Sequence, residues 1–454
     1  MIDLALTLQW FVFAVVAALH VGRRETTPFH PATLYIVFHA LVFVLRPTVV
    51  HAFGFDEQWG HMQFTPTETQ FVRTLLIADV GLLAFLAGTL AARPPVPPRL
   101  VASPAYPRPS PAQWTAFAVM LALLTPPALY GAYRDAFIFG TLAAPGEAGM
   151  IIDPDSAHTY FANTTAYVVK AHNLLIPIAA LIAWLAGFRA WSLVPLAAVV
   201  GYRVYIGSRW GMVLALGVAL LLLMHRRGWS WPPLRMAALA LPLLAAFHVV
   251  GENRDMLRNA LGVGEQRYEQ RERNWSRGID AWDTPSFANF DFLAYVVSVV
   301  PEKSRTYTYF TQHLELFTRP IPRMFWPDKP RGEPIQLVDL NAYGWFGTRT
   351  LSLVGDGWRS AGWLGVVLTC GAVGWFLASL HAWYTRRRDR LFPVAVYACY
   401  LPTVVLWYRG GEIVNAVRFG VWMTAPVLIW WALSALLEHT ASRDRAAAGT
   451  DPAS

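Results

Sequence analysis

The sequence has few charged residues for its length. Only 15% of its 454 residues are charged, whereas 55% are apolar, and a soluble chain of this size would carry about a quarter charged residues. The apolar residues also run in uninterrupted blocks of about 17 to 23, the length that a helix needs to cross a ~30 Å hydrocarbon core. A soluble enzyme is therefore excluded, and the sequence predicts an all-α polytopic membrane protein.

Motifs for metals, nucleotides and disulfides are also absent. The chain has only two cysteines, Cys370 and Cys399, and both lie in apolar blocks, so we interpret them as small core residues. It has no HExxH, DxD or paired-cysteine motif and no glycine loop typical of nucleotide binding. The first apolar block, 4–21, lacks the flanking features of a cleavable signal. We expect no metal and no other cofactor.

The apolar blocks predict about eleven transmembrane helices. They lie at approximately 3–21, 31–53, 70–92, 113–132, 166–187, 190–206, 210–225, 233–251, 362–383, 391–408 and 417–437.

Basic residues fall at every second connection between these blocks. The short connections in between are poor in Lys and Arg, and the loop 54–69 has none. The positive-inside rule therefore places the N-terminus outside the cytoplasm and the C-terminus inside it. The net charge of +8 is a signal of membrane topology, so we expect a lipid bilayer and no nucleic acid as partner.

The order of the blocks divides the chain into four parts. They are an N-terminal bundle of about eight helices at 1–251, a large loop at 252–361, a C-terminal bundle of about three helices at 362–437 and a disordered cytoplasmic tail at 438–454. The large loop carries fourteen basic and fourteen acidic residues. Because long loops are exempt from the charge rule, we expect this loop on the outer side.

Three stretches of the large loop have patterns of their own. The stretches 252–274 and 305–318 are predicted to be helical and partly amphipathic. The run Phe290 to Val300 is apolar but too short to span, so we expect it on the membrane interface or dipping into it. Such interfacial helices would form a roof over a lateral cavity.

Charged residues at or within the spans gather on the outer side. They are Arg46, Arg73, Arg203, Arg209, Arg409, Glu412 and Arg418, and the loop adds Arg254, Arg258, Arg323, Lys329, Arg349 and Arg359. Converging guanidinium groups favour a pyrophosphate site, because each offers rigid paired donors and stays charged. The alternative is snorkelling side chains and helix-end ion pairs. Asp79 and Lys170 lie deeper, where we expect structural ion-pair partners.

Two glycine-rich stretches present a charged side chain at the outer face. In Tyr205-Ile-Gly-Ser-Arg-Trp-Gly211 the glycines permit a tight turn that presents Arg209. In Gly355-Asp-Gly-Trp-Arg-Ser-Ala-Gly-Trp-Leu-Gly365, Asp356 stands directly before a span, where a carboxylate can approach a sugar hydroxyl. The alternative for this aspartate is a helix cap or an ion pair with Arg359.

Proline stiffens a third stretch, Ile321-Pro-Arg-Met-Phe-Trp-Pro-Asp-Lys-Pro330. The prolines limit backbone freedom, so Arg323 and Lys329 would be held in place at low entropic cost. Phe325 and Trp326 would either contact a substrate or serve only as interfacial anchors.

These stretches resemble, in order and spacing, the oligosaccharide repeat-unit polymerases of bacteria, the O-antigen polymerase family of membrane glycosyltransferases. The matching pieces are Phe43-Val-Leu-Arg-Pro47, Gly207-Ser-Arg209, the Pro-Arg…Pro-x-Lys-Pro stretch at 322–330 and the Gly-acid-x-aromatic element at 355–365. The resemblance covers most of the chain. The family more often has Glu where this chain has Asp356.

The resemblance implies a GT-C-like glycosyltransferase bundle in the bacterial inner membrane. Such an enzyme joins repeat units carried on undecaprenyl pyrophosphate at the periplasmic face, for the O-antigen of lipopolysaccharide or for an exopolysaccharide. The growing chain moves from its carrier onto the sugar of a new lipid-linked unit and releases undecaprenyl pyrophosphate. That scheme uses no nucleotide sugar and no metal, and it makes a chain-length regulator a candidate partner.

The hypothesis gives the charged residues roles in this reaction. The donor pyrophosphate is bound by Arg209, Arg323 and Lys329, joined by Arg203, Arg409 and Arg418. Other parts of the substrate contact Arg254, Arg258, Trp326 and Arg359. Asp356, or failing that Glu412, deprotonates or orients the acceptor hydroxyl.

Two other functions share many of these features. An O-antigen ligase uses the same donor with a lipid A core acceptor. A transporter of a lipid-linked or anionic substrate would favour charges near the bilayer midplane and inverted repeats with broken helices.

Overall fold

The structure of the protein is a computed structural model in which the described chain is almost entirely helical. It describes residues 1–23, 26–92, 109–140, 150–152, 159–161, 165–206, 208–234, 236, 283, 285, 287–322, 325–326, 328–330, 332–347 and 349–448. Two short strands in these ranges, β1 (Met150–Ile152) and β2 (Thr159–Phe161), pair in antiparallel fashion.

Nine helical units within these ranges are long and apolar enough to cross a membrane. They are α1 (Ile2–Val21), α2 with η1 and α3 (Pro31–His39, Ala40–Leu45, Arg46–Phe53), α5 (Glu68–Ala91), α6 (Pro111–Gly140), α7 with η2 and α8 (Thr165–Lys170, Ala171–Leu174, Leu175–Leu185), α10 (Arg209–Arg227), α15 (Ser352–Thr385), α16 with η7 and α17 (Leu391–Tyr400, Leu401–Thr403, Val404–Gly410) and α18 (Ile413–Ala448). The structure thus supports the predicted polytopic, helical membrane protein.

Shorter elements connect or flank these units. They are α4 (Glu57–His61), η3 (Ala190–Leu193), α9 (Val194–Tyr205), α13 (Asn289–Val299), η5 (Thr311–Leu314), α14 (Glu315–Thr318) and η6 (Leu340–Tyr343).

Two of the eleven predicted spans have no counterpart among the nine units. The stretch 190–206 forms the turn η3 and the 12-residue helix α9, which is too short to span a ~30 Å core unaided. The predicted span 233–251 lies almost wholly outside the described residues, as does the helix predicted at 252–274.

Local sequence signals start several of these helices. Thr67 and Gln70 form a capping box at the start of α5, each side chain satisfying a backbone N–H of the other. Pro31 stands in the first turn of α2, where its missing N–H costs nothing, and the ring of His30 accepts from the N–H of Ala32. These helices therefore begin where the apolar blocks of the sequence begin.

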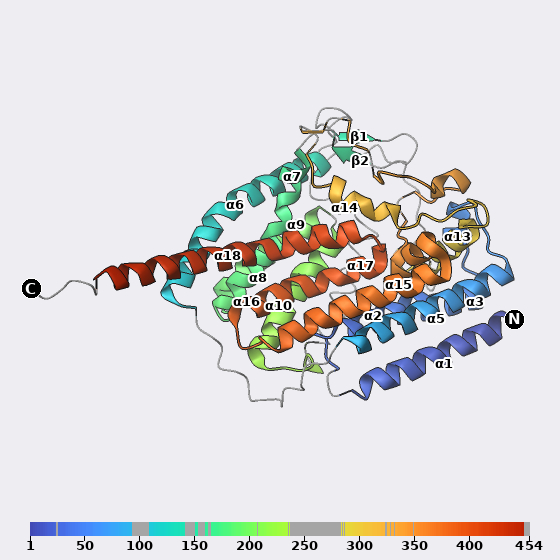
Figure 1. Ribbon diagram of the computed structural model, residues 1–454, viewed down its shortest axis with the longest axis horizontal. Helices are drawn as coiled ribbons and strands as arrows, with labels where there is room; N and C mark the ends of the chain where they lie inside the picture. Colours follow the sequence, from blue (N-terminus) through green and yellow to red (C-terminus); the bar gives the residue numbers. More distant parts are fainter. Residues whose placement is uncertain are drawn as a thin grey trace, which may run out of the picture.

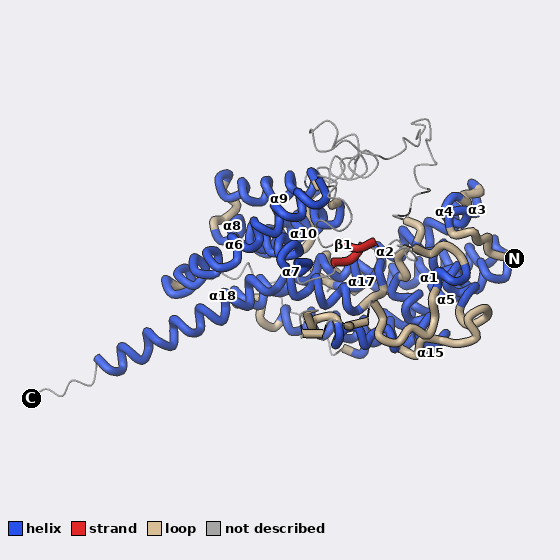
Figure 2. The backbone as a smooth tube through the Cα atoms, turned by 90° about the horizontal axis from the view of Figure 1, so that it is seen from above, coloured by secondary structure: helices blue, strands red, loops and turns tan. Residues whose placement is uncertain are grey.

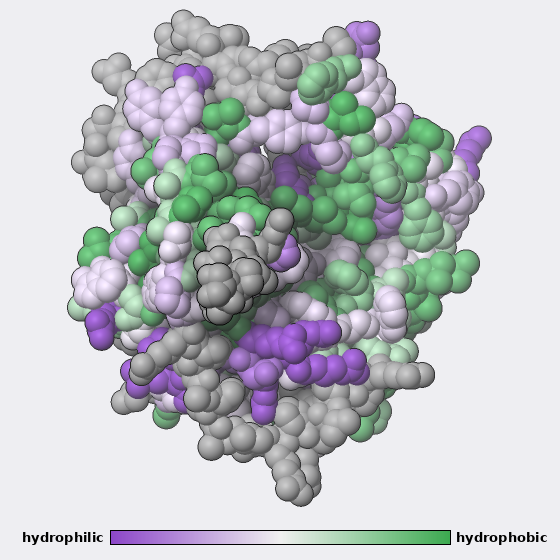
Figure 3. All heavy atoms as spheres, turned by 60° about the vertical axis from the view of Figure 1, so that its left-hand side comes forward, coloured by the Kyte–Doolittle hydropathy of each residue, from purple (hydrophilic) through white to green (hydrophobic). Residues whose placement is uncertain are grey.

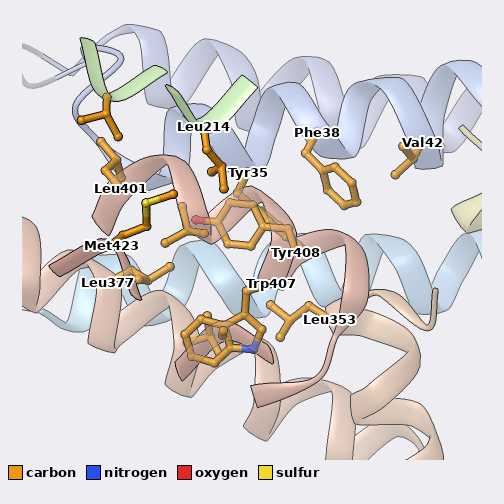
Figure 4. Packing of buried hydrophobic residues seen from close by; sticks show 14 of the residues in the cluster. Tyr35, Phe38, Val42, Leu214, Leu353, Leu377, Leu401, Trp407, Tyr408 and Met423 are labelled. Atoms are coloured by element: carbon orange, nitrogen blue, oxygen red, sulfur yellow. The ribbon is translucent and has the colours of Figure 1, made fainter. Parts of the chain in front are cut away.

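The core lies where α2, α15, α17 and α18 meet, with α5 and α10 against them (Figure 4). Tyr35 stacks on Phe85 with ring centroids 4.0 Å apart, and Tyr408 meets both rings edge-on. Such offset and edge-on pairs suit the charge distribution of aromatic rings. This packing fixes the helices whose ends carry the charged residues.

The helices run alongside one another, so the bundle has two opposite ends (Figure 1). At one end α10 and α15 finish, and the residues there include Arg226, Arg227, Arg386, Arg387, Arg388 and Arg390. Figure 3 turns this end toward the viewer and shows hydrophilic residues gathered on it. The predicted topology assigns this basic end to the cytoplasm.

The predicted topology places the opposite end, where α10, α15 and α18 begin and α17 finishes, outside the cytoplasm, and for this reason we name it the outer end. Figure 1 shows α7, α13, α14 and the two strands along its upper right. Seen from above, in Figure 2, many of the loops gather around α1, α5 and α15.

Three predictions for the large loop and the tail differ from the structure in part. The run Phe290–Val300 forms α13, as short as expected, but every residue of this helix is buried and it packs on α5 and α15, so it is a core helix. Within 305–318 only η5 and α14 are helical. The tail predicted to be disordered from 438 is helical to Ala448, because α18 continues through it.

Candidate functional site

A break in α15 shapes the outer end. The helix changes direction at Ala361 and Gly362, where φ is −160° and +60°. A residue other than glycine would be strained at position 362, and a Cβ there would lie 2.8 Å from the hydroxyl of Tyr307. The break separates a first helical part, 352–360, from the longer part that follows.

The end of this first part anchors the loop that precedes η5. Its last carbonyls lack partners within the helix, and the loop supplies them. Thr308 donates its N–H to the carbonyl of Arg359 at 2.9 Å, and Tyr309 donates to that of Ser360 at 2.9 Å. The loop is thereby fixed to α15, and η5 begins directly after it.

Asp356 lies inside the protein, with 1% of its surface exposed. The Nε2 of His313 lies 2.9 Å from its Oδ2, and Gln312 donates to its Oδ1 at 3.2 Å. The Nη2 of Arg359 lies 3.5 Å from the same Oδ1. Both carboxylate oxygens thus have protein partners, and the ion pair with Arg359 is the alternative that the sequence left open.

Arg359 is held between two carboxylates. Its Nη1 lies 2.6 Å from Oε1 of Glu333, and its Nη2 approaches Asp356. Burial raises the pKa of the Glu333 carboxyl, and Arg359 opposes that rise. Two carboxylates already neutralise the guanidinium of Arg359. Arg359 is therefore better placed to position Asp356 than to bind a substrate phosphate.

His313 is absent from the site residues predicted from the sequence. Its side chain is 28% exposed, and one ring nitrogen faces Asp356. A buried carboxylate that holds an imidazole orients it and stabilises its charged form, which is the arrangement of a general base. The only feature of the sequence that could have pointed to it is that His313 is the single histidine in 252–361. Its spacing from other residues matches no metal motif.

The turn between α17 and α18 brings Glu412 to the same place. Gly411 has a φ of +80°, and a Cβ there would lie 2.3 Å from the carbonyl oxygen of Ser352, so glycine lets this turn pack on the start of α15. Desolvation by the surrounding protein and the charge of Glu315 raise the pKa of Glu412. The two predicted acids therefore lie close together, with Asp356 enclosed and Glu412 more exposed.

Three arginines from three helices lie at the same end. Arg209 is the first residue of α10, Arg409 is the last but one of α17, and Arg418 lies in the first two turns of α18. The charges of Arg209 and Arg409 act on each other, and Arg418 lies in the field of Glu412. Arg409 also lies over the ring of Trp210, 5.4 Å from its centroid.

No carboxylate of the described residues forms a salt bridge with Arg409 or Arg418. Two guanidinium groups without a salt bridge, one in the last turn of α17 and one near the start of α18, form a surface that favours an anion.

Deeper cations are bound by the protein itself. Arg203 is buried and donates from Nη2 to Oδ1 of Asn173 at 3.0 Å. Lys170 lies 3.8 Å from Asp135, so the ion pair predicted for this lysine is present. Asp79 forms no salt bridge within the described ranges, and its Oδ1 has no hydrogen-bond partner there, so the ion pair predicted for Asp79 stays a prediction.

The proline-stiffened stretch contributes a second kind of contact. Lys329 donates from Nζ to the carbonyls of Arg319 at 3.1 Å and Ile321 at 2.9 Å. Phe325 and Trp326 are exposed. The predicted site residues outside the described residues are Arg254, Arg258 and Arg323.

Two predicted cations are neutralised by carboxylates. Arg46 lies 2.6 Å from Asp283 and 2.8 Å from Asp291. Arg73 lies 2.5 Å from Glu302. For these two the ion-pair interpretation describes the structure.

Neither a metal-binding cluster among the described residues nor a known relative is found for this site. Within the part of the chain that the structure describes, no group of three His, Cys, Asp or Glu side chains could hold a metal ion. The chain matches no protein-family model, no curated protein and no solved structure.

Proposed function

We propose that the protein is a membrane glycosyltransferase that polymerises oligosaccharide repeat units carried on undecaprenyl pyrophosphate, at the periplasmic face of the bacterial inner membrane. The observation that carries the proposal is the His313–Asp356 pair at the same end of the bundle as three arginines from separate helices. Transfer of a sugar from a pyrophosphate needs both a base and cations. The resemblance of the sequence to repeat-unit polymerases supports the lipid carrier and the polymerising reaction.

The donor pyrophosphate binds at the start of α10. Backbone N–H groups at a helix N-terminus attract anions, and α10 is 19 residues long with Arg209 as its first residue. Arg409 and Arg418 add charge from α17 and α18. When the bond between the anomeric carbon and the pyrophosphate oxygen breaks, that oxygen keeps the electron pair, and the guanidinium groups stabilise its negative charge.

His313 removes the proton from the acceptor hydroxyl. Because Nε2 faces Asp356, Nδ1 takes the proton while the hydroxyl oxygen attacks the anomeric carbon. Asp356 holds the ring and stabilises the imidazolium, and Arg359 holds Asp356. Glu412, the more exposed acid, orients the acceptor sugar. The products are a lengthened chain on the new carrier and free undecaprenyl pyrophosphate, and His313 returns its proton to water.

The test is transfer by the purified full-length protein in a bilayer supplied with a lipid-linked repeat unit. We expect a ladder of products. In cells, Arg209→Ala should leave single repeat units on the lipid carrier, because the leaving group loses a cation. Arg73→Ala removes a pair with Glu302 and a contact with the ring of Trp358, 5.0 Å from its centroid, but no group assigned to the reaction, so it should keep the ladder and serves as control. Absence of any transfer would contradict the proposal, and a single transfer onto a lipid A core acceptor would identify a ligase.

A further inference from the structure

Four apolar side chains near His313 are left uncovered by the protein. They are Leu314, Phe317, Ile321 and Phe325, and the two phenylalanines are 72% and 74% exposed. These four residues are called the apolar lip below. Leu314, Phe317 and Ile321 stand at helical spacing, which places them on one face of η5 and α14 and the turn that follows. Burial of this face in an apolar environment would be energetically favourable.

The other face of the same segment is polar. Oε1 of Glu315 lies 2.9 Å from Nη1 of Arg319, and His313 meets Asp356. An apolar face opposite a charged face is typical of an element that lies in a membrane interface, with its apolar side 5–10 Å into the boundary of the acyl chains.

The lip is held from the protein side. Tyr167 donates its hydroxyl hydrogen to the carbonyl of Arg319 at 2.9 Å, and Lys329 donates to the carbonyls of Arg319 and Ile321. Tyr167 is also the first residue of a membrane-length unit, Tyr167–Leu185. The lip is therefore a fixed surface at the level where a span begins.

The lip continues a surface that faces lipid. α14 packs on α18, and Figure 1 shows it beside the first turns of that helix. Val417 and Val421, one turn apart at the start of α18, are exposed. Because α18 has the length and composition of a span, we expect these valines to face hydrocarbon, and α14, which carries Phe317, packs on the same helix.

We propose that the apolar lip inserts into the outer leaflet and holds His313 at the membrane surface. The occupant of this face is the hydrocarbon of the bilayer. The functional consequence rests on the proposed glycosyltransferase activity: at that height the base reaches sugars carried close to the membrane on a lipid pyrophosphate, whereas a water-soluble sugar pyrophosphate gains no advantage. The lip thus selects membrane-bound substrates.

Spin labels test the insertion without any reaction. The full-length protein in lipid nanodiscs carries one label, introduced by Phe317→Cys or Phe325→Cys; the two native cysteines are buried. Val421→Cys provides the lipid reference and Glu302→Cys the aqueous reference. We expect labels on the lip to collide with oxygen more than with a water-soluble nickel complex, as at Val421. An aqueous pattern on the lip, or protection from both reagents by another protein surface, overturns the proposal.

Kinetics test the consequence. Phe317→Glu should raise KM for the polyprenyl-linked substrate about tenfold or more, since it removes the burial of a large apolar side chain. KM for a short-chain, water-soluble analogue should not change, and Phe317→Leu should behave as the native protein. Equal changes with both substrates overturn the selective role. If the native protein transfers nothing, the glycosyltransferase proposal fails, while the label pattern still decides whether the lip inserts.

Discussion

The protein contains two triads in which one arginine lies between two carboxylates, and their surroundings differ. The closed triad is Arg46 with Asp283 and Asp291, and the open triad is Arg359 with Asp356 and Glu333. Side chains of the closed triad are at most 6% exposed. In the open triad Glu333 is 21% exposed, and His313 adds an imidazole that reaches the surface.

The difference separates a structural role from a chemical one. A buried triad without an opening holds elements together, here the start of α3 and the helix α13. The open triad adds the partly exposed imidazole of His313, which we propose as the base of the reaction. Under the proposed function, one added histidine and one opening separate a charged group that serves the reaction from one that serves stability.

Removing the imidazole from the open triad should have the largest effect. His313→Ala should lower kcat by about 10²–10⁴-fold, the usual contribution of a general base, with little change in melting temperature because the side chain is partly exposed. His313→Gln keeps a hydrogen-bonding group near Asp356 without a base and should be as slow. A native turnover rate in either variant would remove His313 from the mechanism.

Removing the cation from the closed triad should instead unfold the protein. Arg46→Ala leaves Asp283 and Asp291 buried without a partner, which costs about 3–5 kcal/mol. Thermal unfolding in detergent measures the loss. Arg73→Ala, which breaks a more exposed pair, should cost less than about 1 kcal/mol. An unchanged melting temperature for Arg46→Ala would show that this triad does not stabilise the fold.

Arg409 tests whether a cation without a salt bridge serves the reaction. Arg409→Ala should slow transfer by about 10²–10³-fold, as for other groups that stabilise developing charge. Its melting temperature should change little, because the substitution removes a repulsion with Arg209 together with the contact to the ring of Trp210. Arg409→Lys keeps the charge and should restore part of the rate. A large loss of stability with little loss of rate would make Arg409 a structural residue.

The smallest effect concerns the pH dependence of the open triad. The pKa of Glu333 is raised above its ordinary value of 4.5 by burial, so the folded state binds this proton more tightly than the unfolded state. Its contribution to stability therefore falls as pH rises from about 4.5 through the raised value. Glu333→Gln removes that slope, so its free energy of unfolding relative to the native protein should rise with pH, by less than about 1 kcal/mol. Thermal unfolding over this pH range measures the change. The opposite trend would contradict the assignment.

Much of the fold could be predicted because the thickness of the bilayer fixes the length of a span. Nine of the predicted spans match membrane-length units of the described residues. The stretch 190–206 does not form the predicted span, because its first residues form the turn η3 and leave α9 with only 12 residues. The helix α13 was predicted by length, but its complete burial depends on α5 and α15, which no local pattern reveals.

Less of the site could be predicted. Arg209, Arg409 and Arg418 were recognisable as charges at the ends of spans, and Asp356 as an acid among glycines. No feature of the sequence separates these arginines from Arg46, which has the same kind of position but two carboxylate partners.

The length of an apolar run and the position of a charge within it are local properties. The order of the amino acids is therefore enough to predict that this chain spans a membrane and has arginines at the ends of its helices. Which charges neutralise one another depends on contacts between distant segments. Arg46 meets Asp291 across 245 residues, and His313 meets Asp356 across 43. Only the packing of the helices sets such distances, and with them the division between ion pairs that stabilise the fold and side chains that can act on a substrate.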